Sequence, residues 1–286
     1  VRELKASGLL KPGTRVGLEM RSFQPHRLFS EMIEDAFRDA GCEVVDASLI
    51  LRHARRVKSA AELAHTERAM RICEQGVGAA NRAIAPGVSE LDVQAEILSA
   101  MHHAGGESSA IPIMVQSGNT IGGHQMSRRR LIQSGDHVKI DMCGVYFRYH
   151  GNILRGYYVG DPPSEILERY RRSAGSWEVF AKEARAGRPV AEVNAELRRY
   201  YQEAGLADYP GWCIGYELGI AMAPDWVDEF NFSYDESPPD DVVWEKGYVG
   251  NYETLFDTGL IDTFVIEDHG ARNLGRVPME LIVVDG

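Results

Sequence analysis

The stretch "VKIDMCGVYFRYHGNILRGYYVG", residues 138–160, is the segment on which the interpretation of the whole chain depends. It begins as an apolar strand that ends on a carboxylate, Asp141, and it returns as a second strand that carries Asn152 and Arg155. A metal enzyme would be expected to place acidic side chains at both Asp141 and Asn152, because bound cations need anionic ligands. Because residue 152 is an amide, three interpretations remain open: a metal site, a dismantled metal site or an ordinary hairpin.

The segments around this stretch follow a duplicated order. Ser59 and Glu62 fit a capping box at the start of a helix. Helices are predicted within 59–84, 85–106, 163–187 and 189–205, and strands within 111–118, 131–160 and the region after 210. Two helices, strands, two helices and strands predict an α+β fold, a curved antiparallel sheet with helices packed on its outer face.

Residues 1–56 have a different pattern. A strand (14–20), a helix (24–41) that ends at Gly41 and a second strand (42–50) form a βαβ piece, and a basic linker leads to the helix that begins after Ser59. This piece is short for a complete α/β domain. We therefore expect 1–56 to be the truncated end of a larger N-terminal α/β domain plus a linker, and 57–286 to be the catalytic domain.

Composition and charge exclude several classes of protein. The chain has 286 residues, of which 44% are hydrophobic, and a net charge of −11, which does not suit a nucleic-acid surface. Its apolar runs are shorter than the ~18–20 residues of a membrane span, and we find no signal-peptide pattern. Four cysteines lie far apart with no CxxC spacing, as in reduced thiols of a cytoplasmic protein.

Polar residues that could carry chemistry lie at the expected ends of strands and in a glycine-rich loop. They are His124, Asp141, Tyr216, Glu253, Asp262 and Glu267. Carboxylates and imidazole can hold divalent metals that activate water. The same groups in a dry site can shift the pKa values of one another and act as general acid and base. Taken one at a time, each residue could equally be a solvent-facing or capping side chain.

The order of these residues resembles the pita-bread family. Its members include methionine aminopeptidase, proline dipeptidase, aminopeptidase P, creatinase and ectoine hydrolase. The resemblance runs from about Val57 to Gly286, through "VQSGNTIGGHQ", the stretch quoted above and the tail "IDTFVIEDHGARNLGRVPMELIVV". Residues 14–51 resemble the end of the N-terminal domain of the creatinase and prolidase branches. The resemblance implies a pita-bread fold.

The resemblance also implies which residues would hold metal. Metallopeptidases of the family use two Asp, one His and two Glu to bind two ions. Asp141 matches the first Asp and Glu253 the first Glu, but Asn152 falls where the second Asp belongs and Tyr216 where the His belongs. For the last Glu, aligning the tail places Ile261 there with Asp262 beside it, and aligning "IED" alone gives Glu267. We therefore expect no metal. If one is present, the candidate ligands are Asp141, Glu253, Asp262 and Glu267.

Two members of the family are similar in this respect. Creatinase hydrolyses a C–N bond without metal, with a catalytic histidine at the position matched by His124. Ectoine hydrolase shares the pattern of "GYELGIAMAPDW", residues 215–226, including the tyrosine. The resemblance thus implies a hydrolase of a non-peptide C–N bond, of amide or amidine type, in a small polar metabolite. We predict His124, Glu253 and Tyr216 as catalytic residues, and Asp141, Asn152, Asp262 and Trp226 as substrate-binding residues.

Two alternatives remain open at this point. The first is a metal-dependent Xaa-Pro aminopeptidase or dipeptidase that retains Mn, Fe, Co or Zn. The second is a non-catalytic binding protein on the same scaffold. In either case we expect a small-molecule partner, no nucleic acid and no membrane. Members of the creatinase and prolidase branches are usually homodimers, and we carry that over as an expectation.

Overall fold

The computed structural model describes residues 1–21, 26–118, 125–209, 211–226, 231–256 and 259–286. Its contacts divide the chain into two compact units, Val1–Arg55 and Arg56–Gly286, which we describe separately. This division lies one residue from the boundary drawn in the sequence.

The first unit is a small α/β piece. Its elements are α1 (Arg2–Ala6), β1 (Arg15–Leu18), α2 (Arg27–Asp39), β2 (Glu43–Asp46) and α3 (Ser48–Arg56), with β1 and β2 paired in parallel. The predicted strand 42–50 and the linker after it are wrong, because the strand ends at Asp46 and a helix follows. The Asp46 carboxylate accepts hydrogen bonds from the backbone N–H of Ser48 (2.9 Å) and from its hydroxyl (2.6 Å), a turn that ends the strand.

The second unit is built around one mixed, mostly antiparallel sheet. Its helices are α4 (Ala60–Ala83), α5 (Glu90–His103), α6 (Ser164–Glu183) and α7 (Val190–Glu203). Its strands are β3 (Met114–Ser117), β4 (His137–Tyr146), β5 (Tyr149–Val159), β6 (Gly211–Tyr216), β7 (Asn231–Ser233), β8 (Val249–Phe256), β9 (Leu260–Ile266), β10 (Ala271–Asn273) and β11 (Ile282–Val284). The described strands lie in the order β3-β4-β5-β9-β8-β6-β7, with β10 beside β9 and β11 beside β5.

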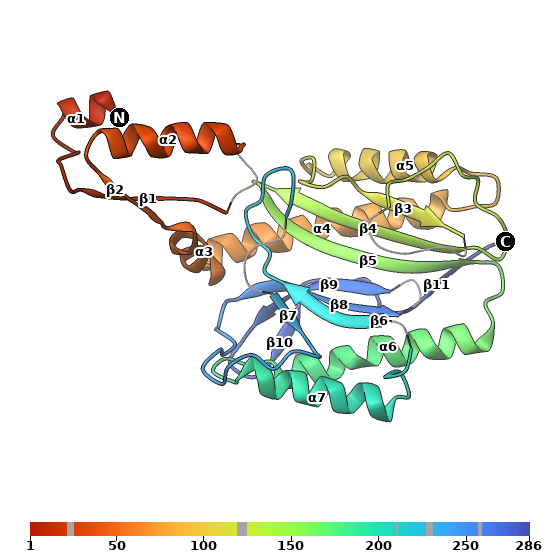
Figure 1. Ribbon diagram of the computed structural model, residues 1–286. Helices are drawn as coiled ribbons and strands as arrows, with labels where there is room; N and C mark the ends of the chain where they lie inside the picture. The colour runs from red at the N-terminus through yellow and green to blue at the C-terminus, as the bar shows by residue number, and fades with distance from the viewer. Residues whose placement is uncertain (22–25, 119–124, 210, 227–230, 257–258) are drawn as a thin grey trace. The chain divides into compact units, whose positions relative to one another are not determined.

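Two pairs of helices cover two halves of this sheet (Figure 1). Helices α4 and α5 lie over β3, β4 and β5, and helices α6 and α7 lie along the half that contains β6, β8 and β9. The predicted α+β fold, a sheet with helices on its outer face, is therefore confirmed. The close approach of α4 to β4 depends on Gly144, since a Cβ there would lie 2.1 Å from the carbonyl oxygen of Ala69.

Strand alternation divides the side chains of the sheet into two sets. Gly144 and Gly151 face α4, because a Cβ on Gly151 would meet the sulfur of Met70 at 2.6 Å. Successive side chains of a strand point to opposite faces. Residues 139, 141 and 143 of β4 and residues 150, 152 and 154 of β5 therefore point away from the helices. We call this side of the sheet the interior face.

A two-residue turn fixes the register of β4 and β5. Phe147 and Arg148 have φ angles of 49° and 63°, as a type I′ hairpin turn requires, and Tyr146 pairs with Tyr149. The Glu107 carboxylate accepts hydrogen bonds from both turn N–H groups, at 2.8 Å from Phe147 and 3.2 Å from Arg148. This register sets Asp141 opposite Leu154 and Cys143 opposite Asn152.

Two further expectations from the sequence were that the cysteines are reduced and that the chain has no membrane-spanning segment. All four cysteines are buried and free of disulfides. Within the described residues, no helix combines the length and the apolar character needed to cross a membrane.

Candidate active site

The strand register places two of the predicted carboxylates in one row across the interior face. Asp141 on β4 and Glu253 on β8 belong to residues that are directly paired from strand to strand. The row runs Asp141, Leu154, Ile261, Glu253 and Ile214. Asn152 and Asn251 lie two residues from Leu154 and Glu253 on the same strands, so they face the same side. Residues more than a hundred positions apart in the sequence therefore gather at one point of the sheet.

A continuous chain of hydrogen bonds connects the two carboxylates. The Nδ2 atom of Asn152 donates to Oδ1 of Asp141 at 2.9 Å and to the carbonyl oxygen of Met142 at 3.1 Å. The Nδ2 atom of Asn251 donates to Oδ1 of Asn152 at 3.2 Å and to Oε1 of Glu253 at 2.7 Å. Two amides thus bridge the carboxylates through their N–H groups.

The same chain extends to the predicted tyrosine and tryptophan. The Tyr216 backbone N–H donates to Oδ1 of Asn251 at 2.8 Å. The Tyr216 hydroxyl accepts a hydrogen bond from Nε1 of Trp226 at 2.9 Å, and its proximity to Glu253 acts to lower the pKa of that carboxyl group. Burial raises the pKa of the Tyr216 phenol well above its usual range, so the phenol stays protonated and can donate. The structure therefore brings together Asp141, Asn152, Tyr216, Trp226 and Glu253, five of the residues singled out in the sequence; their catalytic and substrate-binding roles stay predictions.

Burial makes Glu253 an unusual carboxyl group. It raises the pKa of Glu253 to about 8, and the neighbouring Asp141 carboxylate acts in the same direction. Hydrogen bonds from Asn251 and Tyr216 and the positive charge of Lys139 oppose the shift. Glu253 is therefore mostly protonated at neutral pH and can give up a proton to a basic atom.

Asp262 does not belong to this group, which corrects the prediction that it binds substrate. It follows Ile261 on β9 and so points to the opposite face, where it is fully buried. Its carboxylate accepts a hydrogen bond from Nη2 of Arg155 at 2.6 Å, in an ion pair with no exposure on either side. Burial raises the pKa of Asp262, and the Arg155 guanidinium opposes this shift.

Two further predicted residues are not placed in the cluster. The Glu267 side chain is half-exposed and pairs with Nε of Arg272 at 2.6 Å, so it is not available as a ligand at the interior face. His124 lies outside the described residues, and its catalytic role stays a prediction from the sequence.

The interior face also holds residues that the sequence analysis missed. Asn251 precedes Glu253 by two positions, and Lys139 precedes Asp141 by two positions. The period-two spacing of a strand is a signal that could have found both. His150 also points to this face, with its ring centroid 6.4 Å from that of Trp226.

His150 is a structural residue of this face. Its Nε2 accepts a hydrogen bond from the backbone N–H of Ala110 at 3.1 Å, and its Nδ1 donates to the carbonyl oxygen of Arg148 at 2.9 Å. Both ring nitrogens are thus occupied, and burial lowers the pKa of His150 to about 4. A neutral imidazole with no free nitrogen cannot serve as the proton carrier of the site.

Comparison with known proteins places this arrangement in a family. Residues 64–270 match metallopeptidase family M24 over most of the chain. The chain belongs to family M24. It is therefore a hydrolase that acts on C–N bonds, and the resemblance to the pita-bread family is confirmed.

Its relatives are mostly peptidases. The chain is 27% identical over 279 residues to an uncharacterized peptidase of Bacillus subtilis, a match that covers 94% of this chain and 75% of that protein. It is 25% identical over 240 residues to a Xaa-Pro dipeptidase of Pyrococcus furiosus, covering 82% of this chain and 67% of the relative. The X-Pro aminopeptidase of Thermotoga maritima has the same fold, with a TM-score of 0.83 at 19% identity over 99% of this chain and 77% of that one.

One relative acts on another kind of substrate. The ectoine hydrolase of Halomonas elongata is 26% identical over 185 residues, which is 63% of this chain and 45% of that enzyme.

The residues present at the interior face do not fit the two-ion centre that the M24 resemblance implies. Ile261, an apolar residue, occupies the row position next to Glu253, so neither Asp262 nor Glu267 supplies a third carboxylate there. The Asn152 amide donates its N–H to Asp141, where a second carboxylate would be needed. Among the described residues the interior cluster therefore offers two carboxylates, one of them with a raised pKa, and too little negative charge for two divalent ions.

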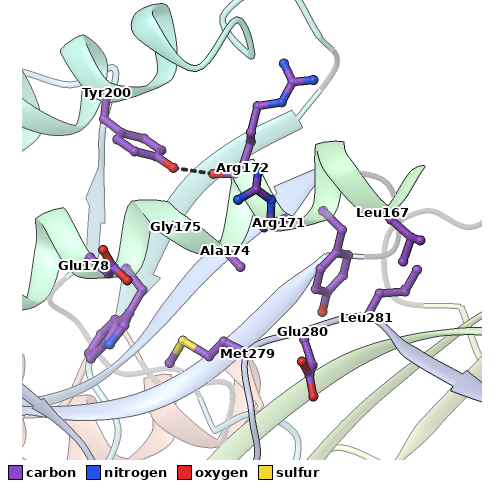
Figure 2. Close-up of a pocket in the computed structure, with 12 residues that line it drawn as sticks. Leu167, Arg171, Arg172, Ala174, Gly175, Glu178, Tyr200, Met279, Glu280 and Leu281 are labelled. Atoms are coloured by element: carbon purple, nitrogen blue, oxygen red, sulfur yellow. Dashed lines mark hydrogen bonds between the residues drawn. The ribbon is translucent and has the colours of Figure 1, made fainter. Parts of the chain in front are cut away.

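A separate groove lies beside α6, with a volume of about 640 Å³ (Figure 2). Its lining includes Arg171, Arg172, Tyr200 and Met279. The two arginines pair with Glu168, and the Tyr200 hydroxyl donates to the carbonyl oxygen of Arg172 at 2.7 Å. The lining contains none of the interior cluster, so this groove is separate from the candidate site at the interior face.

Proposed function

We propose that this chain hydrolyses a non-peptide C–N bond, of amide or amidine type, in a small polar metabolite and that it does so without a metal ion. The observation that carries the proposal is the amide bridge between Asp141 and Glu253. In it, the N–H groups of Asn152 and Asn251 satisfy carboxylate oxygens that would otherwise be available to cations. The matched ectoine hydrolase supports a non-peptide substrate.

Hydrolysis of such a bond requires a proton to leave water and another to reach the departing nitrogen. A protonated Glu253 is suited to support the nitrogen, by a hydrogen bond or by giving it the proton. The Asp141 carboxylate is suited to hold a cationic or N–H-rich part of the substrate and to orient water. We retain His124, on the sequence evidence, as the group that takes the proton from water.

The tyrosine and the tryptophan complete the site. Tyr216 keeps its phenolic proton, so its hydroxyl can donate a hydrogen bond to the oxygen that becomes negative as water adds to the carbon. The Trp226 indole holds this hydroxyl through Nε1 and is itself buried. Trp226 is therefore suited to wall the substrate and to fix the direction of the phenol.

A second candidate function is a Xaa-Pro dipeptidase or aminopeptidase. The comparisons support it more broadly than the first. Relatives such as the Pyrococcus furiosus enzyme are Xaa-Pro dipeptidases, whereas the first candidate is supported by a single relative cited above, the ectoine hydrolase. The donor atoms at the interior face favour the first candidate, because they do not fit the metal centre that the second requires.

One experiment separates the two candidates. Purified protein is treated with a chelator, dialysed and assayed against ectoine, N-acetylated diamino acids and Ala-Pro, with and without added Mn²⁺. We expect turnover of an amidine or non-peptide amide that is unchanged by the chelator. Turnover confined to Ala-Pro, and dependent on added Mn²⁺, would overturn the proposal in favour of the peptidase.

We also propose that the chain forms a homodimer, as the resemblance implies, and that it is cytoplasmic, as its four separated cysteines suggest. Light scattering coupled to gel filtration tests the first point, with twice the chain mass as the expected result.

A further inference from the structure

Lys139 is a buried cation on the interior face. It lies on β4, two residues before Asp141, and it is 8% exposed. In the described part of the chain, its ammonium group forms neither a hydrogen bond nor an ion pair. An ammonium carries three donors, and the ammonium of Lys139 is not fully closed off from solvent although most of the side chain is buried, so a ligand can reach it.

The other buried lysine of this unit shows the contrast. Lys58 is 7% exposed, and its Nζ lies 2.7 Å from Oε1 of Glu217, in an ion pair whose two side chains are almost completely buried. Lys58 thus has the partner that burial of a charge requires. Among the described residues, Lys139 has no such carboxylate partner, although it lies on the interior face together with Asp141 and Glu253.

The neighbours of Lys139 leave its side chain room toward that cluster. On one side it pairs with Gln116 of β3, and on the other with Gly156 of β5. Gly156 has no side chain, so the four-carbon stem of Lys139 can lie over β5 toward β9 and β8. The positive charge of Lys139 is felt at Glu253, where it opposes the rise in pKa.

The distance along strand β4 sets the size of a ligand that could contact both Lys139 and the carboxyl groups of Asp141 and Glu253. Residues two apart on a strand are separated by about 7 Å. An anionic group held by the ammonium would therefore lie within the length of a small metabolite from Asp141 and Glu253. Arg155 on β5 does not compete for such a group, because it points to the opposite face and pairs with Asp262.

We propose that Lys139 binds a carboxylate group of the substrate, and that this hydrolase acts on small carboxylates such as amino-acid derivatives. The inference rests on the proposed function and narrows its substrate class. It applies equally to a carboxylated amidine and to a dipeptide, since both carry the group that the ammonium would hold.

The test compares binding of matched charged and neutral ligands. Dissociation constants are measured by calorimetry for ectoine against its methyl ester, and for Ala-Pro against Ala-Pro amide. Wild-type protein should bind at least one carboxylate about tenfold to a hundredfold more tightly than its neutral counterpart. Lys139→Met should abolish this preference, and Lys139→Arg should retain part of it. The matched control is Lys246→Met, because Lys246 is an exposed lysine paired with Asp268.

The preference is read from binding and not from rates of hydrolysis, so this inference and the proposed function can fail separately. Where the wild-type protein turns a ligand over, the same comparison is made in a Glu253→Gln background, in which turnover is slowed. A wild-type protein that shows no preference for either carboxylate would overturn the inference. A preference that survives in Lys139→Met, or an equal loss of charged and neutral ligands in that variant, would do the same. Thermal unfolding of each variant confirms that it is folded, and the midpoint of Lys139→Met is expected to stay close to that of wild type, because the substitution leaves no buried carboxylate without its partner.

Discussion

At Glu253, burial keeps a carboxyl group protonated at neutral pH beside a second carboxylate, Asp141. A hydrogen bond from Asn251 holds Glu253 in place, but neither it nor the nearby Tyr216 reverses the effect of burial on the pKa of Glu253. Pairs of carboxyl groups whose environments separate their pKa values are suited to divided acid and base roles. The environment of Glu253 therefore leads directly to predictions on how activity and stability depend on pH.

The first prediction concerns the pH dependence of activity. If the protonated form of Glu253 is the active one, kcat/KM falls as pH rises through an apparent pKa of about 8. Glu253→Gln should lower kcat by roughly 10²–10⁴-fold and remove this limb of the profile. A wild-type profile that stays flat to pH 9, or a Glu253→Gln variant with normal kcat, would contradict this role.

The second prediction concerns the pH dependence of stability. The folded-state pKa of Glu253 is about 8, against a usual value of 4.5, so the unfolded chain releases this proton first as pH rises. The stability associated with Glu253 is then present below pH 4.5 and is lost as pH rises to about 8. Glu253→Gln should therefore gain about 2–4 kcal/mol in free energy of unfolding relative to wild type between pH 5 and pH 9. Urea unfolding at both pH values measures this, with the surface variant Glu168→Gln as the control.

The third prediction has the opposite sign. The folded-state pKa of His150 is about 4, against a usual value of 6.5, so the unfolded chain takes up a proton first as pH falls. Stability associated with His150 is therefore lost as pH falls from 6.5 to about 4. His150→Gln should flatten the acid side of the stability curve by roughly 2 kcal/mol, as measured by urea unfolding at pH 4.5 and pH 7. An unchanged acid slope in this variant would show that His150 is already charged in the folded state.

Among the elements, Arg155 joins β5 to β9 and to the segment before the last strand. Its Nη1 donates to the carbonyl oxygens of Leu154 (2.9 Å) and Ile261 (2.8 Å), and its Nη2 donates to Asp262. Its Nε and Nη2 also donate to the carbonyl oxygens of Pro278 and Val277, at 3.0 and 2.9 Å. One buried guanidinium thus fixes the strand pair that sets Leu154 opposite Ile261.

The fourth prediction tests this junction. Arg155→Met should lower the free energy of unfolding by about 3–5 kcal/mol, because it leaves Asp262 buried without its partner. Adding Asp262→Leu should recover much of the loss, whereas the exposed control Arg171→Met should change little. Chemical unfolding of wild type, Arg155→Met, Asp262→Leu and the double variant measures the coupling. A double variant no more stable than Arg155→Met alone would show that the carbonyl contacts matter more than the ion pair.

The elements also show where the sequence was sufficient. The capping box at Ser59 is formed as predicted, with the Glu62 carboxylate accepting from the Ser59 N–H at 2.8 Å. The strand predicted at 42–50 was wrong because a short apolar run is compatible with either a strand or a helix. The turn at Asp46 decides between them, and that contact is visible only in the structure.

The assignment of Asp262 to the site failed for a related reason. Strand β9 is buried along its whole length, so its residues show no alternation between apolar and polar positions. The sequence could not tell whether Ile261 or Asp262 points to the interior face. The register with Glu253 settles this in favour of Ile261, and it also reveals Asn251 and Lys139, which the search for metal ligands overlooked.

For the whole molecule, the duplicated order of helices and strands predicted the fold because each half needs two helices to cover its sheet. The family order of Asp141, Tyr216 and Glu253 then pointed to the candidate site, and the structure joins these residues through Asn152 and Asn251. The substrate could not be predicted, because it depends on the shape and charge of the interior face rather than on the order of motifs. Whether the site binds a metal ion could not be predicted either, because it depends on which donor atoms each side chain presents to the interior face.

The central claim is that amide N–H groups, and not cations, hold the two carboxylates of this site together. The measurement that tests it most directly is the thermal unfolding midpoint of chelator-treated wild-type protein with and without saturating Mn²⁺, beside Asn152→Asp. A ligand that binds the folded state raises the midpoint. We predict no shift for wild type and an upward shift for Asn152→Asp, which restores a third carboxylate to the site. A shift of several degrees in the wild-type protein would contradict the account.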